Sequence, residues 1–159
     1  MYTSAIITVS DRASVGTYTD LSGPAIQKML TDAGYSIVGV VIIPDKKNAI
    51  TEALLSEASR GTSLILTTGG TGFSPRDITP EATLDVIERE CPGIAEYMRM
   101  RSMEITPRAM LSRGVAGIRG RSLIVNLPGS PKAAAENLSF ILPHLSHGLD
   151  ILSGKKADG

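Results

Sequence analysis

Short, almost uninterrupted apolar runs alternate along this chain with longer segments of helical pattern, and this alternation limits the fold more than any other feature. The runs occupy residues 4–9, 37–43, 64–67 and 123–127. Runs of this length that are rich in β-branched residues are typical of strands buried on both faces. Because such strands alternate with helices, we expect an α/β protein with a mostly parallel sheet that helices cover on both sides.

Helical patterns are predicted at 24–33, 49–60, 79–90, 94–104 and 132–152, with a further short strand at 115–118. Thr79-Pro80-Glu81 is a typical helix start. The Thr79 hydroxyl can accept a hydrogen bond from an unpaired backbone amide, Pro80 suits the first turn, and Glu81 complements the helix dipole. Pro143 is expected to bend or divide the last helix.

The size and charge of the chain limit its partners. A length of 159 residues suits one domain, which we assign to residues 1–153, followed by a flexible tail at 154–159. Lys plus Arg and Asp plus Glu both number 16. This balance lacks the basic surface of a protein that binds nucleic acid or an anionic membrane, although a small anion needs only a local pocket.

The amino-terminal stretch is too polar after a short apolar run to be a signal peptide, and no apolar segment reaches the roughly 20 residues that span a bilayer. Cys91 is the only cysteine, so an internal disulfide and a multi-cysteine metal site are both excluded. These observations predict a cytoplasmic protein.

Polar residues, glycines and prolines directly follow four of the expected strands. They are Ser10-Asp11-Arg12, Pro44-Asp45-Lys46, Gly69-Gly70-Thr71-Gly72 and Pro128-Gly129-Ser130-Pro131. The carboxyl ends of parallel strands share one edge of the sheet, and ligands of open α/β sheets bind there. We therefore expect these four segments to converge on one ligand site.

Among these segments, the glycine block at 69–72 points to a particular ligand chemistry. Without side chains, its backbone amides can turn towards a phosphate and form an anion-binding nest, and Thr71 adds a hydroxyl. The same glycines also suit a tight turn that binds nothing. Because three other polar segments are expected at the same edge, we favour phosphate binding.

Two acids accompany the glycine block, and an acid beside a phosphate is repulsive unless a cation lies between them. Mg²⁺ commonly uses one or two carboxylates together with phosphate oxygens, so Asp45 and Asp77 are predicted to hold Mg²⁺. Structural roles compete with this prediction: Asp77 as a cap or turn residue before Thr79, and Asp45 as a cap on the following helix.

Other polar residues in these segments have two plausible roles each. Arg12 and Arg76 can pair with phosphate or with nearby acids. Ser130 can bind a ligand at the N-terminus of the last helix or simply cap that helix.

Three segments together carry a resemblance that covers nearly the whole chain in order: ITVSDRASVGTYTD at 7–20, TTGGTGFSPRDITPEAT at 67–83 and ITPRAMLSRGVAGIRGRSLIVNLPGSPKAAAENL at 105–138. They resemble the MoaB/Mog family of molybdenum-cofactor biosynthesis proteins, which includes the gephyrin and plant Cnx G domains. The most specific part is the glycine block followed by Pro-Arg-Asp-x-Thr-Pro-Glu-Ala-Thr.

The resemblance implies a three-layer α/β/α sandwich that assembles as a trimer, in some members as a hexamer. It implies a Mg²⁺-dependent adenylyltransferase that transfers AMP from ATP to molybdopterin, releases pyrophosphate and hands its product to a molybdate-inserting enzyme. The family's two functional aspartates match Asp45 and Asp77. Its substrate- and nucleotide-binding positions match Ser10, Asp11, Gly69, Gly70, Thr71, Gly72, Pro128, Gly129 and Ser130.

Other functions remain compatible with these residues. The same fold can bind molybdopterin or a nucleotide without turnover, as a carrier or scaffold. Molybdate-inserting enzymes carry a similar glycine block but are much longer, and a damage-inducible nucleotide-processing protein of similar fold would hydrolyse other nucleotides.

Overall fold

Strands and helices alternate in the computed structural model, which describes residues 1–155. The strands are β1 (Thr3–Val9), β2 (Ser36–Ile43), β3 (Leu64–Thr68), β4 (Arg89–Glu90), β5 (Ala116–Arg119) and β6 (Ser122–Leu127). The helices are α1 (Asp11–Ser14), α2 (Ser22–Asp32), α3 (Lys47–Ser59), α4 (Thr79–Val86), α5 (Pro92–Met103) and α6 (Pro131–Leu152), with a 3₁₀ helix, η1 (Pro107–Leu111).

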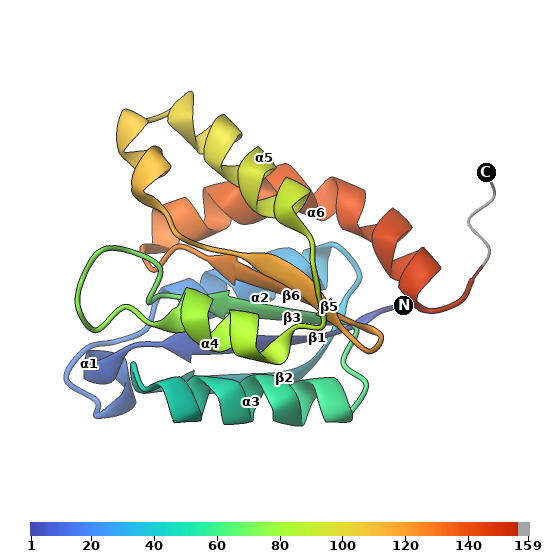
Figure 1. Cartoon of the computed structure of the whole chain (residues 1–159), viewed down its shortest axis with the longest axis horizontal. Helices are drawn as coiled ribbons and strands as arrows, with labels where there is room; N and C mark the ends of the chain where they lie inside the picture. The colour runs from blue at the N-terminus through green and yellow to red at the C-terminus, as the bar shows by residue number, and fades with distance from the viewer. Residues whose placement is uncertain (156–159) are drawn as a thin grey trace.

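The strands form one six-stranded sheet in the order β2-β1-β3-β6-β5-β4. Helices α3 and α4 pack on one face, and α2, α5 and α6 pack on the other (Figure 1). The predicted three-layer α/β/α sandwich is confirmed.

Neighbouring residues of a strand serve different layers of the core. Ile6 belongs to the cluster that includes Ile26 of α2 and Leu138 of α6, whereas Ile7 belongs to the cluster that includes Ile50 of α3. All of these side chains are fully buried. Successive side chains of a strand point to opposite faces, so a strand that is buried on both faces must be apolar throughout, as the sequence pattern indicated.

The direction of winding reverses at β1. From β1 the chain passes to β2 on one side and then to β3 on the other, and these pairs and the β3–β6 pair are parallel. Strands β5 and β4 continue the sheet in antiparallel pairs. The carboxyl ends of β1 and β3 therefore form a topological switch point, where open α/β sheets bind ligands.

Some predicted elements differ from the structure. Helix α4 ends at Val86, and β4, which pairs with β5, replaces the last turn that the pattern suggested. Ile78, not Thr79, occupies the N-cap position, and the buried Thr79 hydroxyl has no hydrogen-bond partner among residues 1–155. Pro143 does not divide α6, because buried residues anchor the helix on both sides of it.

Strand β2 is less buried than its apolar run predicted. It lies at the edge of the sheet, and Val38, Val40, Val41 and Ile42 are 36–45% exposed. A strand at an edge has a neighbour on one side only, which the residue pattern cannot reveal.

The predicted tail begins at Gly154, but residues 156–159 lie outside the described part of the chain, and its flexibility stays a prediction. Over residues 1–155, no helix combines the length and the apolar character that crossing a membrane requires.

Candidate functional site

A cavity of about 570 Å³ opens over the carboxyl ends of β1 and β3. All four polar segments contribute to it, as predicted. The predicted residues that line it are Ser10, Asp11, Asp45, Gly69, Gly70, Asp77, Gly129 and Ser130.

Three predicted residues do not line this cavity. Thr71, Gly72 and Pro128 face a second cavity of about 310 Å³, beside α5 and η1. The chain turns away after Gly70, because the Thr71 carbonyl accepts a hydrogen bond from the Arg113 amide (2.9 Å). The Thr71 side chain is buried at that point, so its hydroxyl lies outside the main cavity.

Asp45 and Asp11 join the ends of β2 and β1 by two reciprocal hydrogen bonds. The Asp11 amide donates to Asp45 Oδ2, and the Asp45 amide donates to Asp11 Oδ1, both at 2.9 Å. Asp45 therefore does not cap α3, whose N-cap residue is Lys46. Burial raises the pKa of Asp45; the Asp11 amide opposes this shift, while the carboxylates of Asp11 and Asp77 add to it. Three acids thus share one electrostatic environment.

Asp77 closes the loop that follows the glycines. Its Oδ2 accepts from the Ser74 amide (3.0 Å), and its own amide donates to the Ser74 carbonyl (2.9 Å). Asp77 is therefore a turn residue, which was one of the structural roles predicted for it. Among the described residues, no hydrogen bond or ion pair engages Oδ1 of either Asp45 or Asp77, which leaves one carboxylate oxygen of each for a ligand.

Both carboxylates lie against the backbone of the glycine block. A Cβ on Gly70 would lie 3.2 Å from Asp45 Oδ1, and a Cβ on Gly72 would lie 2.9 Å from Asp77 Oδ2. The described residues contain no group of three His, Cys, Asp or Glu side chains that could hold a metal. Two carboxylates suit Mg²⁺ when phosphate oxygens and water complete its shell, so the donor set fits a cation that arrives with a phosphorylated ligand.

The turn of residues 69–71, here called the glycine turn, owes its glycines first to packing. Gly69 and Gly70 have φ angles of +101° and +68°. A Cβ on Gly69 would lie 2.3 Å from the Val9 carbonyl oxygen, and a Cβ on Gly70 equally close to Thr79 Oγ1. The Gly69 amide donates to the Leu127 carbonyl (3.2 Å), so a nest for phosphate cannot use it and would begin at Gly70.

Ser10 and Ser130 both act as helix caps. Each hydroxyl accepts a hydrogen bond at 3.1 Å from the amide three residues later, at Ala13 and Ala133. Ser130 thereby places the positive end of α6, a helix of 22 residues, at the edge of the cavity. The cap role is confirmed, and a direct contact between Ser130 and a ligand stays a prediction.

The two arginines at the cavity are already paired. Arg76 donates from Nε and Nη2 to Asp11 Oδ2, both at 2.9 Å. Burial would raise the pKa of Asp11, but the Asp45 amide and Arg76 together hold it below its usual value. The Arg12 guanidinium lies 4.8 Å from the centroid of the Tyr18 ring. Acid pairing, one of the two roles predicted for Arg76, is the one observed.

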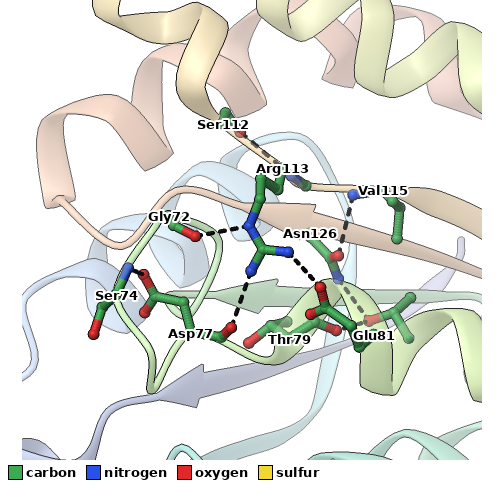
Figure 2. Close-up of polar contacts among 11 residues, drawn as sticks. Gly72, Ser74, Asp77, Thr79, Glu81, Ser112, Arg113, Val115 and Asn126 are labelled. Carbon is green, nitrogen blue, oxygen red and sulfur yellow. Dashed lines mark hydrogen bonds and ion pairs between the residues drawn. The ribbon is translucent and has the colours of Figure 1, made fainter.

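Several cavity residues were not predicted. Asp20 accepts from Thr8 Oγ1 (2.8 Å) and from the Ser22 amide (3.0 Å), and all three line the cavity. Their only sequence signal was the position of Thr8 near the end of a strand and of Asp20 before a helix. Arg113 was not predicted either. It does not line the cavity, but it donates hydrogen bonds to the Gly72 and Asp77 carbonyls from behind the loop of residues 72–77, here called the acidic loop (Figure 2).

A doubly wound sheet with paired carboxylates and a helix N-terminus at its switch point defines an α/β protein whose site suits a phosphorylated ligand. Residues 5–147 match the family model described as a probable molybdopterin binding domain. The chain therefore belongs to this family, the MoaB/Mog group of molybdenum-cofactor biosynthesis proteins.

Individual relatives agree with this assignment. The chain is 43% identical over 152 residues to the molybdopterin adenylyltransferase of Helicobacter pylori strain J99, covering 94% of this chain and 86% of that protein. It is 47% identical over 140 residues to the Escherichia coli K12 molybdopterin adenylyltransferase, covering 86% and 71%. The crystal structure of the molybdopterin biosynthesis enzyme MoaB from Thermus thermophilus matches with a TM-score of 0.92 and 47% identity over 98% of both chains.

Proposed function

We propose that this protein is a molybdopterin adenylyltransferase that transfers AMP from ATP to molybdopterin. The observation that carries the proposal is the placement of Asp45 and Asp77, from separate loops, against the glycine block of residues 69–72 at the switch point. Proteins named for this activity are 43–47% identical to the chain over most of its length, which supports it.

The reaction needs no covalent enzyme intermediate. An oxygen of the terminal phosphate of molybdopterin attacks the α-phosphorus of ATP, and a new P–O bond forms. The bond from the α-phosphorus to the oxygen that bridges to the β-phosphorus breaks, and its electron pair leaves with pyrophosphate. Because the attacking phosphate is already anionic, the protein has to supply positioning and charge compensation rather than a nucleophile.

The residues of the cavity divide this work. Asp45 and Asp77 would hold Mg²⁺ through their unengaged Oδ1 atoms, and the bound cation would supply positive charge close to the phosphates. The Gly70 amide and the N-terminus of α6 at Ser130 provide dipoles for phosphate oxygens.

Purified protein incubated with molybdopterin, ATP and MgCl₂ tests the proposal directly. We expect an adenylylated pterin by mass spectrometry, an equal amount of pyrophosphate, and neither product after EDTA treatment. The alternative, a binding protein of the same fold, predicts calorimetric binding of molybdopterin or ATP with no release of pyrophosphate.

We also propose that the chain forms a homotrimer in the cytoplasm and passes its product to a molybdate-inserting enzyme. The exposed apolar side chains of the edge strand β2 support an assembly, since such strands are usually covered. Light scattering on the eluting peak of a sizing column would give three chain masses; a single chain mass would contradict the trimer.

A further inference from the structure

Arg113 links its own segment to four points around the acidic loop, and Figure 2 shows three of these contacts converging on its guanidinium. Its backbone amide donates to the Thr71 carbonyl (2.9 Å). Its Nε donates to the Gly72 carbonyl (2.8 Å), and its Nη2 donates to the Asp77 carbonyl (2.9 Å). Its Nη1 pairs with Glu81 Oε1. One side chain therefore holds both ends of the loop and the first turn of α4.

Arg113 is itself held firmly. Arg99 of α5 donates from Nη1 to the carbonyls of Ser112 (3.3 Å) and Gly114 (2.8 Å), the residues on either side of Arg113. Val115, which follows Gly114, donates a hydrogen bond from its amide to Asn126 Oδ1 of β6 (3.1 Å). The guanidinium thus projects from a segment that both α5 and the sheet anchor.

The acidic loop has few other attachments. Its internal hydrogen bonds join Ser74 to Asp77 and to the Arg76 amide, so they close the loop on itself. Among the described residues, its remaining side-chain bond to the rest of the protein is the Arg76–Asp11 pair at the exposed surface. Phe73 is 71% exposed and contributes little packing. A backbone hydrogen bond from the Thr79 amide to the Gly70 carbonyl (3.1 Å) joins the residues that flank the loop. Within the loop, however, the carbonyls at both ends are held by Arg113, so the position of the loop depends largely on this residue.

The geometry of the guanidinium matters more than its charge. The side chains of Arg113 and Glu81 are 33% and 40% exposed, and ion pairs this exposed contribute little to stability. Two carbonyls and a carboxylate in different directions, however, match the planar fork of arginine, which the single ammonium of lysine cannot reproduce. Arg113 does not line the main cavity, so it acts through the loop rather than on a ligand.

We propose that Arg113 is the positioning residue of this site, and that it holds the acidic loop so that the Asp77 carboxylate stays at the cavity. The effect of Arg113 on catalysis rests on the proposed function, but its effect on the position of the acidic loop does not. Substitutions of residues that support a metal ligand typically reduce metal affinity or activity by about 10–100-fold.

The test compares Arg113→Lys with Arg119→Lys. Arg119 also donates from a partly buried guanidinium to a backbone carbonyl, that of Val86 (2.8 Å), but it lies on β5 outside the cavity. The first readout is hydrogen exchange in metal-free protein. The Ser74 amide donates to the Asp77 carboxylate within the loop, and Arg113 holds the Gly72 and Asp77 carbonyls at the two ends of that loop, so release of these ends should loosen the Ser74–Asp77 bond. We expect this amide to exchange about tenfold faster in Arg113→Lys, and unchanged in Arg119→Lys.

The second readout is the adenylylation rate as a function of Mg²⁺. We expect the half-saturating Mg²⁺ concentration to rise about tenfold in Arg113→Lys, with most of the rate recovered at high Mg²⁺. A merely structural role would lower the rate without this shift. Glu81→Gln, which keeps an oxygen acceptor for Nη1, should change both readouts by less and replaces Arg113→Lys if that variant does not fold.

The outcomes separate the two proposals. Unchanged Ser74 exchange overturns the role of Arg113 whether or not the protein turns over. Faster exchange with an unchanged Mg²⁺ requirement also overturns it, because Asp77 would then not depend on the loop. If the Ser74 amide exchanges faster in Arg113→Lys but the wild-type protein forms no adenylylated pterin, the role of Arg113 in positioning the loop is supported and the proposed function is wrong.

Discussion

The glycine turn and the acidic loop are neighbours in the chain and border the same cavity, yet different forces hold them. The turn is held by backbone against backbone: Gly69 packs on the Val9 carbonyl, its amide bonds to Leu127, and Gly129 approaches it closely. The acidic loop instead depends on the side chain of Arg113, which reaches it from a distant segment.

This difference means that the glycine turn sets the shape of the cavity, whereas the acidic loop sets the position of the Asp77 carboxylate. A turn in which a single added carbon would overlap a carbonyl oxygen is close-packed, so it gives the cavity a well-defined floor. A loop held by a few half-exposed polar contacts opens at lower free energy, so the carboxylate it carries is easier to displace. We therefore expect substitutions in the turn to change stability and substitutions in the loop to change metal use.

The largest effect is expected for Asp77→Ala. Loss of a carboxylate that is proposed to hold Mg²⁺ should lower the adenylylation rate by about 10²-fold or more, on the scale of one preorganised electrostatic contact. Initial rates of adduct formation across a MgCl₂ series measure it. Asp85→Ala is the matched control, because Asp85 lies on α4, pairs with Lys47 and does not line the cavity. If Asp77→Ala kept the wild-type rate, the proposal that the acidic loop binds Mg²⁺ through Asp77 would be wrong.

Gly69→Ala should act on stability. The added Cβ meets both an unfavourable φ and the Val9 oxygen, at costs of roughly 1–2 and 1–3 kcal/mol. Gly34→Ala is the control, because Gly34 has a φ of +87° but no atom of the described residues within 4 Å of the point that a Cβ would occupy. Urea unfolding measures both. Equal losses in the two variants would show that packing does not hold the turn.

A smaller loss is expected for Ser130→Ala, which removes the cap of α6 and should cost about 1 kcal/mol in the free energy of unfolding. Ser130→Asp keeps a capping oxygen but places a negative charge at the cavity. If Ser130 also faces a phosphate, Ser130→Asp should unfold like wild type in urea and bind ATP more weakly in calorimetry. Wild-type ATP binding by Ser130→Asp would leave Ser130 as a cap alone.

The smallest effect concerns the pH dependence of the loop's attachment. Burial would raise the pKa of Glu81, but the hydrogen bonds from Arg113 and from its own backbone, together with the charges of Arg113 and Lys47, outweigh burial and leave this pKa below its usual value. The stabilisation is therefore complete above the ordinary glutamate pKa of about 4.3 and is lost as the pH falls through the lower folded value. The difference in urea midpoint between wild type and Glu81→Gln should shrink over that range; a constant difference would exclude the titration of Glu81 as its origin.

Much of the fold and part of the site could be predicted because they depend on local patterns. Successive residues of a strand covered on both faces, such as Ile6 and Ile7, must both be apolar, so buried strands can be recognised in the sequence. Parallel strands present their carboxyl ends at one edge, so Asp45 and Asp77 could be placed together before any distance was known. The exposure of β2 could not be predicted, because an apolar run does not show whether its strand lies at the edge of the sheet.

By itself, the sequence determined the layered α/β fold, the edge of the sheet that carries the site and the two acids at that edge, since these follow from periodicity and chain direction. Only the tertiary structure decided which groups face the cavity: Thr71 turns away, the Gly69 amide is used by Leu127, and Arg113 supports Asp77 from behind. Such contacts join residues far apart in the chain, and their directions depend on packing that no local pattern encodes.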